Sequence, residues 1–414
     1  MNRPSPPLLV LTNGHGEDVI ARRVLESLLA SRIDISVAVL PLVGRGDGFR
    51  GLPRLSLLGR PQQLPSGGFS NQSLMALLQD LRAGVVGLTW EQWREVRRWA
   101  RLHPHGRLLA VGDLLPLLMA WGSGRPYGFI GTPKSDYTWR TPLHCSPLAD
   151  ACHGLKGSEW DPWEWALMGC RRARLVAMRD RITARGLRRR GIQALAPGNP
   201  MLDGFPRQAA LPPSLQGQRR LLLLCGSRMP EALDNGCRLL AVLEQAPLWA
   251  QSLLVLMATG GEPTRAALES LLHAEGFVPA PLPTEPAAEG CWRRGRHILL
   301  LGVGRFAQWA CWAELGLATA GTATEQLVGL ARPAVSLSGP GPQFTRGFAR
   351  RQARLLGGAV HPCDSAAQAA RWLALLLAEP GLRQRLGLIG RSRMGPPGGS
   401  ARLAALLQER LLHD

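Results

Sequence analysis

Residues 321–326 place a glycine, hydroxyl groups and an acid–amide pair between an apolar run and an amphipathic segment. This order predicts a strand, a tight turn and the start of a helix. Such a turn directs backbone N–H groups and hydroxyls at one point, which suits an anion such as a nucleotide phosphate. The alternative is an ordinary strand-to-helix loop with a threonine cap. The predicted contacts are Gly321, Thr322, Ala323, Thr324, Glu325 and Gln326.

A second turn of this kind follows the apolar run 221–225. It consists of Gly226, Ser227 and Arg228, and a helical segment containing Glu231 comes next. A backbone turn beside a guanidinium is well suited to clamp a diphosphate. If both preceding strands belong to one sheet, the two turns lie close together, and the pair is far more specific than either turn alone.

A third loop, residues 339–348, follows an expected strand at 333–337 and again leads into a helix. Gln343 in this loop is placed to bond the hydroxyls of a bound sugar. The alternative is an ordinary turn rich in proline and glycine.

Titratable side chains follow the first expected strand, at His15, Glu17 and Asp18. Gly14 and Gly16 allow close approach of the backbone, but the third glycine of the dinucleotide fingerprint is missing, which argues against NAD. The loop better suits a sugar acceptor and its general base. The alternative is that an acidic residue here only caps the helix.

Asp113 ends the apolar run 108–112 at the carboxyl edge of a predicted sheet, where ligands of open α/β sheets bind. A carboxylate there can take the proton from an acceptor hydroxyl, and burial would raise its pKa to suit that role. The alternative is that Asp113 caps a helix at 114–121.

These residues depend on short β-type runs that alternate with amphipathic helices along the chain. Expected strands are 8–12, 35–40, 107–111, 126–130, 174–178, 192–196, 220–225, 252–257, 297–301, 315–319, 333–337 and 358–361. Expected helices are 18–31, 91–102, 180–190, 231–245, 264–275, 322–330, 345–356 and 365–379. The alternation predicts two parallel, doubly wound α/β domains.

A stretch rich in proline and glycine, 197–213, reads as the linker between the two series of strands. The predicted domains are therefore residues 1–197 and 198–380. Terminal helices at 381–414 can cross back to the first domain.

Composition narrows the class of partner. The formal net charge is +19, and only two of the 49 basic residues are lysines. A basic surface favours anionic partners, but dispersed arginines and the absence of zinc-finger or RNA-binding signatures argue against nucleic acid. The eight cysteines contain no C-x-x-C pair and read as small buried hydrophobes of a reducing compartment. The set His144, Cys145, Cys152 and His153 matches no common zinc spacing.

The protein is expected to contact the surface of a membrane rather than to span it. No run of about twenty apolar residues occurs, and the N-terminal apolar run is too short for a signal peptide. Residues 74–81 and 85–99 mix apolar and basic character, as peripheral membrane segments do. A helix packed on the sheet with an arginine-rich solvent face fits the same pattern. Long irregular stretches are expected at 41–70 and 131–168; the second carries four tryptophans that could cover an acceptor, touch a bilayer or pack over the sheet edge.

The order and spacing of these motifs resemble lipid-A-disaccharide synthase and its relatives, which are glycosyltransferases of the GT-B class. The resemblance runs over most of the chain, is strongest at 225–228 and 320–324, and includes 176–180 and 197–200. Residues 13–18, 324–326 and 342–345 resemble a subgroup labelled lipid-A-disaccharide synthase-related. The synthase has its ribose-contacting Glu one position later, where this chain has Gln326 after Glu325, and it has a small residue in place of His15.

The resemblance implies two Rossmann-like domains facing a central cleft. The second would bind a UDP-sugar, with Arg228 near the diphosphate and 321–324 near the nucleotide. The first would bind a lipid-linked acceptor at the membrane, with Asp18 and Asp113 in the cleft. The expected reaction is inverting transfer of a sugar of the acylated glucosamine type, as in lipid A biosynthesis. No D-x-D pair is present, so neither metal nor cofactor is expected.

The resemblance also implies a cytoplasmic protein, peripheral on the inner face of the plasma membrane. Two alternatives stay open. One is a UDP-sugar epimerase of the same fold, and the other is a non-catalytic protein that binds nucleotide sugars or lipid.

Overall fold

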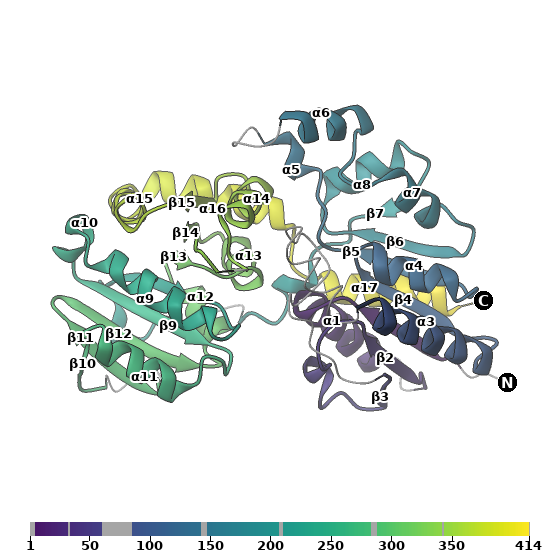
Figure 1. Cartoon of the computed structure of the whole chain (residues 1–414), viewed down its shortest axis with the longest axis horizontal. Coiled ribbons are helices and arrows are strands. Elements are labelled where there is room, and N and C mark those ends of the chain that lie inside the picture. Colours follow the sequence, from purple (N-terminus) through teal and green to yellow (C-terminus); the bar gives the residue numbers. More distant parts are fainter. Residues whose placement is uncertain are drawn as a thin grey trace. The chain divides into compact units, whose positions relative to one another are not determined.

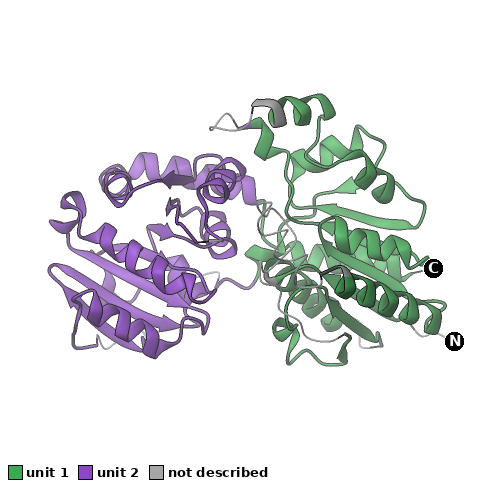
Figure 2. Ribbon diagram, in the orientation of Figure 1, with its two compact units in different colours: residues 1–140, 145–203, 395–414 green, residues 141–144, 204–394 purple. Residues whose placement is uncertain are grey.

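The chain forms two α/β units in a computed structural model that describes residues 5–31, 34–59, 85–141, 147–206, 210–282, 288–341 and 343–413. Unit 1 comprises residues 1–140, 145–203 and 395–414, and unit 2 comprises residues 141–144 and 204–394 (Figure 2). Each unit has its own sheet and its own hydrophobic core.

Most strands of the unit 1 sheet are short apolar runs buried on both faces, which is typical of parallel strands, but the edge run 55–57 is largely exposed. Its strands pair in the order β3-β2-β1-β4-β5-β6-β7 (Figure 1), all in parallel. They are β1 (Leu8–Thr12), β2 (Val37–Pro41), β3 (Leu55–Leu57), β4 (Arg107–Gly112), β5 (Tyr127–Gly131), β6 (Ala173–Met178) and β7 (Ala194–Leu195). The strand order reverses between β1 and β4, so a crevice is expected at the carboxyl ends of these two strands.

Helices cover both faces of this sheet. They are α1 (His15–Ser31), α3 (Val85–Leu102), α4 (Leu114–Gly122), α5 (Tyr137–Arg140), α6 (Pro147–Lys156), α7 (Pro162–Met168), α8 (Arg181–Arg188) and α17 (Gly399–Leu407). Leu9 and Leu11 of β1 belong to one core cluster with residues of α3, α4 and α7. Side chains alternate along a strand, so Leu8 and Val10 face the opposite side. Helix α17 packs along α1.

The sheet of unit 2 has the order β10-β11-β12-β9-β8-β13-β14-β15, with an antiparallel edge at β10, β11 and β12. The strands are β8 (Arg219–Leu224), β9 (Leu253–Thr259), β10 (Val278–Pro279), β11 (Gly290–Arg294), β12 (His297–Val303), β13 (Leu315–Ala318), β14 (Ala334–Leu337) and β15 (Val360–Cys363). In this sheet the order reverses between β8 and β13, so these two strands flank the expected crevice.

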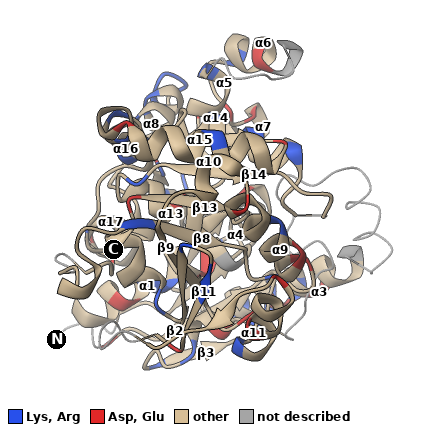
Figure 3. Cartoon of the chain, turned by 90° about the vertical axis from the view of Figure 1, so that its left-hand side faces the viewer, with Lys and Arg blue, Asp and Glu red and all other residues tan. Residues whose placement is uncertain are grey.

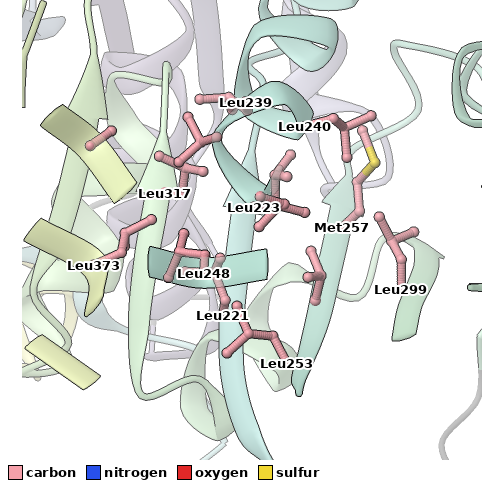
Figure 4. Packing of buried hydrophobic residues seen from close by; sticks show 14 of the residues in the cluster. Leu221, Leu223, Leu239, Leu240, Leu248, Leu253, Met257, Leu299, Leu317 and Leu373 are labelled. Carbon is pink, nitrogen blue, oxygen red and sulfur yellow. The ribbon is translucent and has the colours of Figure 1, made fainter. Parts of the chain in front are cut away.

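A leucine-rich core joins the sheet of unit 2 to its helices (Figure 4). Leu221 and Leu223 of β8 pack there with Leu239 of α9, Leu317 of β13 and Leu373 of α15. The helices are α9 (Glu231–Leu243), α10 (Ala246–Trp249), α11 (Arg265–Ala274), α12 (Phe306–Trp312), α13 (Thr322–Gly329), α14 (Arg346–Leu356), α15 (Ala366–Ala378) and α16 (Pro380–Met394).

The predicted fold class, two doubly wound parallel α/β domains, is confirmed. The stretch 131–168 was wrongly expected to be irregular, because α5, α6 and α7 lie within it. Its Trp160 is fully buried, whereas Trp163 is 59% exposed. Of the expected irregular stretch 41–70, residues 60–70 lie outside the described part, and the rest contains β3.

Candidate functional site

The acidic residues that the sequence singles out follow β1 and β4, at the sheet edge where a crevice is expected. Strands β1 and β4 are paired, with Thr12 opposite Val111. Gly112 has φ of 138°, and a Cβ at this position would lie 3.0 Å from the Cβ of Asn13 and 3.4 Å from the Cγ of Glu17. The loops after the two strands therefore pack tightly against each other, and only glycine fits at this point of contact.

Asp18 lies in the first turn of α1, where it is 4% exposed and its Oδ1 has no hydrogen-bond partner among the described residues. Burial raises the pKa of Asp18 to about 7; the Thr12 hydroxyl opposes this rise, and the neighbouring Glu17 adds to it. A buried carboxyl group that titrates near neutral pH can accept a proton from a substrate hydroxyl.

Asp113 is the N-cap of α4, and its Oδ1 accepts a hydrogen bond of 3.1 Å from the backbone N–H of Leu115. The capping role, offered by the sequence as an alternative, is thus real. Burial nevertheless raises the pKa of Asp113 above its ordinary value, while the Leu115 N–H and the charge of Lys134 act in the opposite direction. A cap can leave the second carboxylate oxygen for chemistry, so the two roles are compatible.

Glu17 is held in place by a residue that follows β5, the neighbour of β4 in the sheet. The Thr132 hydroxyl, directly after β5, donates to its Oε1 at 3.0 Å. His15 is the first residue of α1, but its side chain lies outside the described part of the structure. Sequence reasoning missed Thr132 and Lys134, whose position after β5 at the same sheet edge was the available signal.

In unit 2 the two candidate turns adjoin each other, as the sequence requires for a joint site. Strands β8 and β13 pair in parallel, and the backbone N–H of Thr319 donates to the Leu224 carbonyl at 2.8 Å. Gly226 has φ of 90°, and a Cβ there would lie 3.5 Å from the Thr319 carbonyl oxygen. Both turns therefore open at the point where the strand order reverses.

The turn before α13 is held by side chains buried beneath it. Gly321 caps the helix, and Thr322 is its first residue. The fully buried Thr324 hydroxyl donates to the Ala320 carbonyl at 2.6 Å, and the Gln352 amide donates to the Gly321 carbonyl at 3.1 Å. Thr324 thus points into the protein and shapes the turn, whereas Thr322, Ala323, Glu325 and Gln326 are half-buried at its surface.

Arg228 follows Gly226 and the exposed Ser227 at the end of β8. It is half-buried, and burial lowers its pKa while the nearby Glu231 carboxylate raises it. A partly desolvated guanidinium binds a phosphate more strongly than one surrounded by water, because fewer water contacts compete.

The loop that carries Gln343 is fastened to α9. The Glu231 carboxylate accepts two backbone hydrogen bonds, from the N–H of Gln343 at 3.1 Å and from the N–H of Phe344 at 3.0 Å. Gln343 itself is half-buried. Pro342, part of the resemblance, lies outside the described residues. Sequence reasoning noted Glu231 only as a helix residue and missed this contact.

The basic helix predicted near 85–99 is present as α3, but its tryptophans divide between surface and core. Trp90 is 56% exposed, and the Arg94 guanidinium carbon lies 5.5 Å from its ring centroid. Trp99 is buried, and Trp93 packs against the core. The outward arginines of the helix are Arg94, Arg97, Arg98 and Arg101. Residues 74–81 lie outside the described part.

Basic residues occur on many elements of the described chain (Figure 3). The expectation of buried cysteines holds for Cys225, Cys291 and Cys363 but is wrong for the exposed Cys152, and Cys311 is half-buried. The described residues contain no cluster suited to hold a metal ion; His144 and Cys145 lie outside them. In the same residues no helix is both long and apolar enough to cross a bilayer.

Solved structures share this fold at low sequence identity. UDP-GlcNAc 2-epimerase from Neisseria meningitidis, bound to UDP-GlcNAc, is 14% identical, with 97% of this chain and 100% of that chain covered and a TM-score of 0.51. MurG from Acinetobacter baumannii is 14% identical, with 98% and 99% covered and a TM-score of 0.53. A UDP-glucosyltransferase from Polygonum tinctorium is 13% identical, with 99% and 100% covered and a TM-score of 0.58.

No protein-family model and no curated protein sequence matches the chain. The structural similarity extends over nearly the whole chain in each case, and the fold is the GT-B fold that glycosyltransferases and UDP-GlcNAc 2-epimerases have in common.

Proposed function

We propose that the protein is an inverting, metal-independent glycosyltransferase that moves a sugar of the acylated glucosamine type from UDP to a lipid-linked acceptor. The sequence resemblance to lipid-A-disaccharide synthase supports this reaction, and the GT-B fold is compatible with it. Unit 2 would bind the donor, and unit 1 would bind the acceptor.

One observation carries the proposal: two glycine turns adjoin each other at the ends of the paired strands β8 and β13, with Arg228 on one of them. Backbone N–H groups at helix starts, together with a guanidinium, favour a diphosphate. The same groups would stabilise the departing UDP, whose negative charge grows in the transition state. Gln343 would bond the hydroxyls of the donor sugar, and Glu325 or Gln326 would accept from the ribose.

The crevice of unit 1 supplies the proton acceptor. In the proposed step the acceptor hydroxyl attacks the anomeric carbon, the bond from that carbon to UDP breaks, and a carboxylate takes the hydroxyl proton. Asp113 and Asp18 are both buried carboxyl groups with raised pKa, and Glu17 lies beside Asp18 in the first turn of α1. Either Asp is suited to act as the base.

A lipid-linked acceptor requires access to a bilayer, and α3 offers a fitting surface. Its exposed Trp90 and outward arginines combine an interfacial aromatic ring with positive charge. Such a helix face binds headgroups of anionic lipids without inserting across the membrane. We therefore include peripheral membrane contact in the proposal.

Replacing Asp113 by Asn tests the reaction. We expect sugar transfer from a UDP-activated acylglucosamine to a glycolipid acceptor in detergent micelles to fall by roughly a hundredfold or more, as for loss of a general base. UDP binding should persist, because the donor site lies in unit 2. Turnover close to that of the unchanged protein would rule out Asp113 as the base.

A UDP-sugar epimerase is the second candidate, because epimerases share the fold. Incubation with UDP-N-acetylglucosamine alone separates the two reactions, since only an epimerase interconverts the sugar without an acceptor. Tight UDP binding with neither reaction would instead favour a non-catalytic nucleotide-sugar or lipid-binding protein.

A further inference from the structure

Helix α9 presents a polar face to the loop after β14. Glu231, Asn235 and Arg238 are spaced four and three residues apart, so they lie on one side of the helix. Glu231 is 9% exposed and Asn235 is 4% exposed. Buried polar side chains need partners: Glu231 and Arg238 find theirs in this loop, and Asn235 accepts from Arg238.

The loop is tied to this face at both of its ends. At its start, the Arg238 guanidinium donates to the Ser338 carbonyl and, at 3.3 Å, to the Asn235 side chain. At its end, the Glu231 carboxylate accepts from two successive N–H groups, those of Gln343 and Phe344. The N–H of Gly339 donates to the Phe344 carbonyl at 2.9 Å, which closes the loop on itself.

Glu231 is packed against the loop as well as bonded to it. A Cβ added to Gly341 would come within 2.7 Å of the Glu231 Cγ, which leaves no room for a larger residue. The carboxylate is therefore fixed both by its two hydrogen bonds and by the backbone beside it.

The same carboxylate is near the turn at the end of β8. Glu231 lies three residues after Arg228, and its negative charge acts on the guanidiniums of both Arg228 and Arg238. One side chain thus connects the turn proposed for the diphosphate with the loop proposed for the donor sugar.

We propose that Glu231 is a positioning residue that sets the place of Gln343 by holding the backbone of residues 343 and 344. The inference rests on the proposed UDP-sugar site and deepens it. Glu231 would touch neither sugar nor phosphate, and its contribution to the affinity for the sugar would pass through Gln343.

The test uses the full chain with two probes, UDP and UDP-N-acetylglucosamine, in isothermal titration calorimetry. Glu231→Gln replaces one accepting oxygen by an NH2 group that faces a backbone N–H. We expect its affinity for the nucleotide sugar to fall by roughly tenfold or more, the effect of losing a hydrogen bond to a charged group. Its affinity for UDP should not fall, because Gln343 would contact only the sugar, and removing a negative charge near Arg228 does not weaken the attraction of that guanidinium for a diphosphate.

A double-mutant comparison identifies the route of the effect. If Glu231 acts through Gln343, adding Glu231→Gln to Gln343→Ala causes little further loss of affinity for the nucleotide sugar. Losses that add would overturn the inference, as would equal losses for UDP and the nucleotide sugar or no loss at all. Glu269→Gln is the matched control, since Glu269 lies on α11 in a surface ion pair with Arg265.

Gly341→Ala provides a second perturbation from the side of the loop if Glu231→Gln does not fold. The added Cβ would push against the Glu231 side chain. It should lower the affinity for UDP-N-acetylglucosamine more than the affinity for UDP. If the unchanged protein binds neither probe, the proposed function itself fails, and this outcome is distinct from a failure of the positioning role.

Discussion

Asp18→Asn should make the protein more stable, by an amount that grows with pH. Asp18 is buried at 4% exposure, and its Oδ1 lacks a hydrogen-bond partner among the described residues. Its pKa rises from 3.8 to about 7 on folding because burial disfavours the charged form. Asparagine is similar in shape and never ionises, so it removes the cost of burying a carboxyl group at high pH without opening a cavity.

The sign and size of the change in the free energy of unfolding follow from proton linkage. Below pH 3.8 the carboxyl group is protonated in both the folded and the unfolded protein, and its stabilising contribution is fully present. As pH rises toward 7, the unfolded chain loses the proton while the folded protein keeps it, so this contribution to the free energy of unfolding is lost. At 1.36 kcal/mol per pH unit the full loss is about 4 kcal/mol above pH 7.

The assay is urea unfolding followed by tryptophan fluorescence at pH 5, 6, 7 and 8. The gain in unfolding free energy of Asp18→Asn over the unchanged protein should increase by roughly 2–3 kcal/mol between pH 5 and pH 8. Glu26→Gln is the control, because Glu26 lies on the same helix in a surface pair with Arg22 and should change stability by less than about 1 kcal/mol.

A gain that is independent of pH would show that Asp18 is not a buried group with a raised pKa. Destabilisation at pH 8 would contradict the reasoning more strongly. If Asp18 also serves the proposed reaction, the more stable variant should transfer sugar more slowly, since active-site groups are often retained at a cost in stability.

Two further substitutions in unit 2 distinguish a residue that contacts the ligand from a residue that only stabilises the turn. Arg228→Ala should lower the affinity for UDP by roughly tenfold to a hundredfold, as measured by calorimetry, because a charge-assisted contact to the diphosphate is lost; unchanged affinity would exclude the proposed clamp. Thr324→Val should lower the free energy of unfolding by about 1 kcal/mol in urea melts, since it removes the buried hydrogen bond to Ala320. Its UDP affinity should be nearly unchanged, and a loss as large as that of Arg228→Ala would place Thr324 in contact with the ligand.

Most parallel strands could be predicted because their central residues are apolar, whereas the largely exposed parallel edge strand β3 was not predicted. Leu8–Leu11 and Leu221–Leu224 are buried on both faces of a sheet, so burial leaves a clear trace in the sequence. Strand β11 was missed because Arg293 and Arg294 interrupt any apolar run at the antiparallel edge. Helix α7 was missed because it spans only seven residues and depends on a capping box formed by Asp161 and Glu164.

The candidate site was predictable as far as it depends on strand ends. The turns at 226–228 and 321–322 follow strands that proved to be neighbours, and the acids at 18 and 113 follow another neighbouring pair. Burial of Asp18 could not be read from the sequence, because segments distant along the chain pack beside it; a Cβ at Gly48 would lie 3.6 Å from that of Asp18.

Partners distant in sequence account for the remaining omissions. The Glu231 carboxylate bonds to a backbone N–H that is 112 residues away. Thr132 donates to Glu17 across 115 residues. Almost every residue has a backbone N–H, so the sequence does not indicate which one a carboxylate will bind. The contact made by Glu231 could therefore be identified only from the fold.

Binding of a UDP-sugar by the turns after β8 and β13 can be tested directly. Thermal unfolding of the full chain should be measured with saturating UDP-N-acetylglucosamine, ADP-glucose and GDP-mannose in parallel. We expect selective stabilisation by the UDP-sugar, worth about 3 kcal/mol at a hundredfold excess over its dissociation constant, and loss of this effect in Arg228→Ala. No shift with the UDP-sugar, or equal shifts with all three nucleotides, would contradict it.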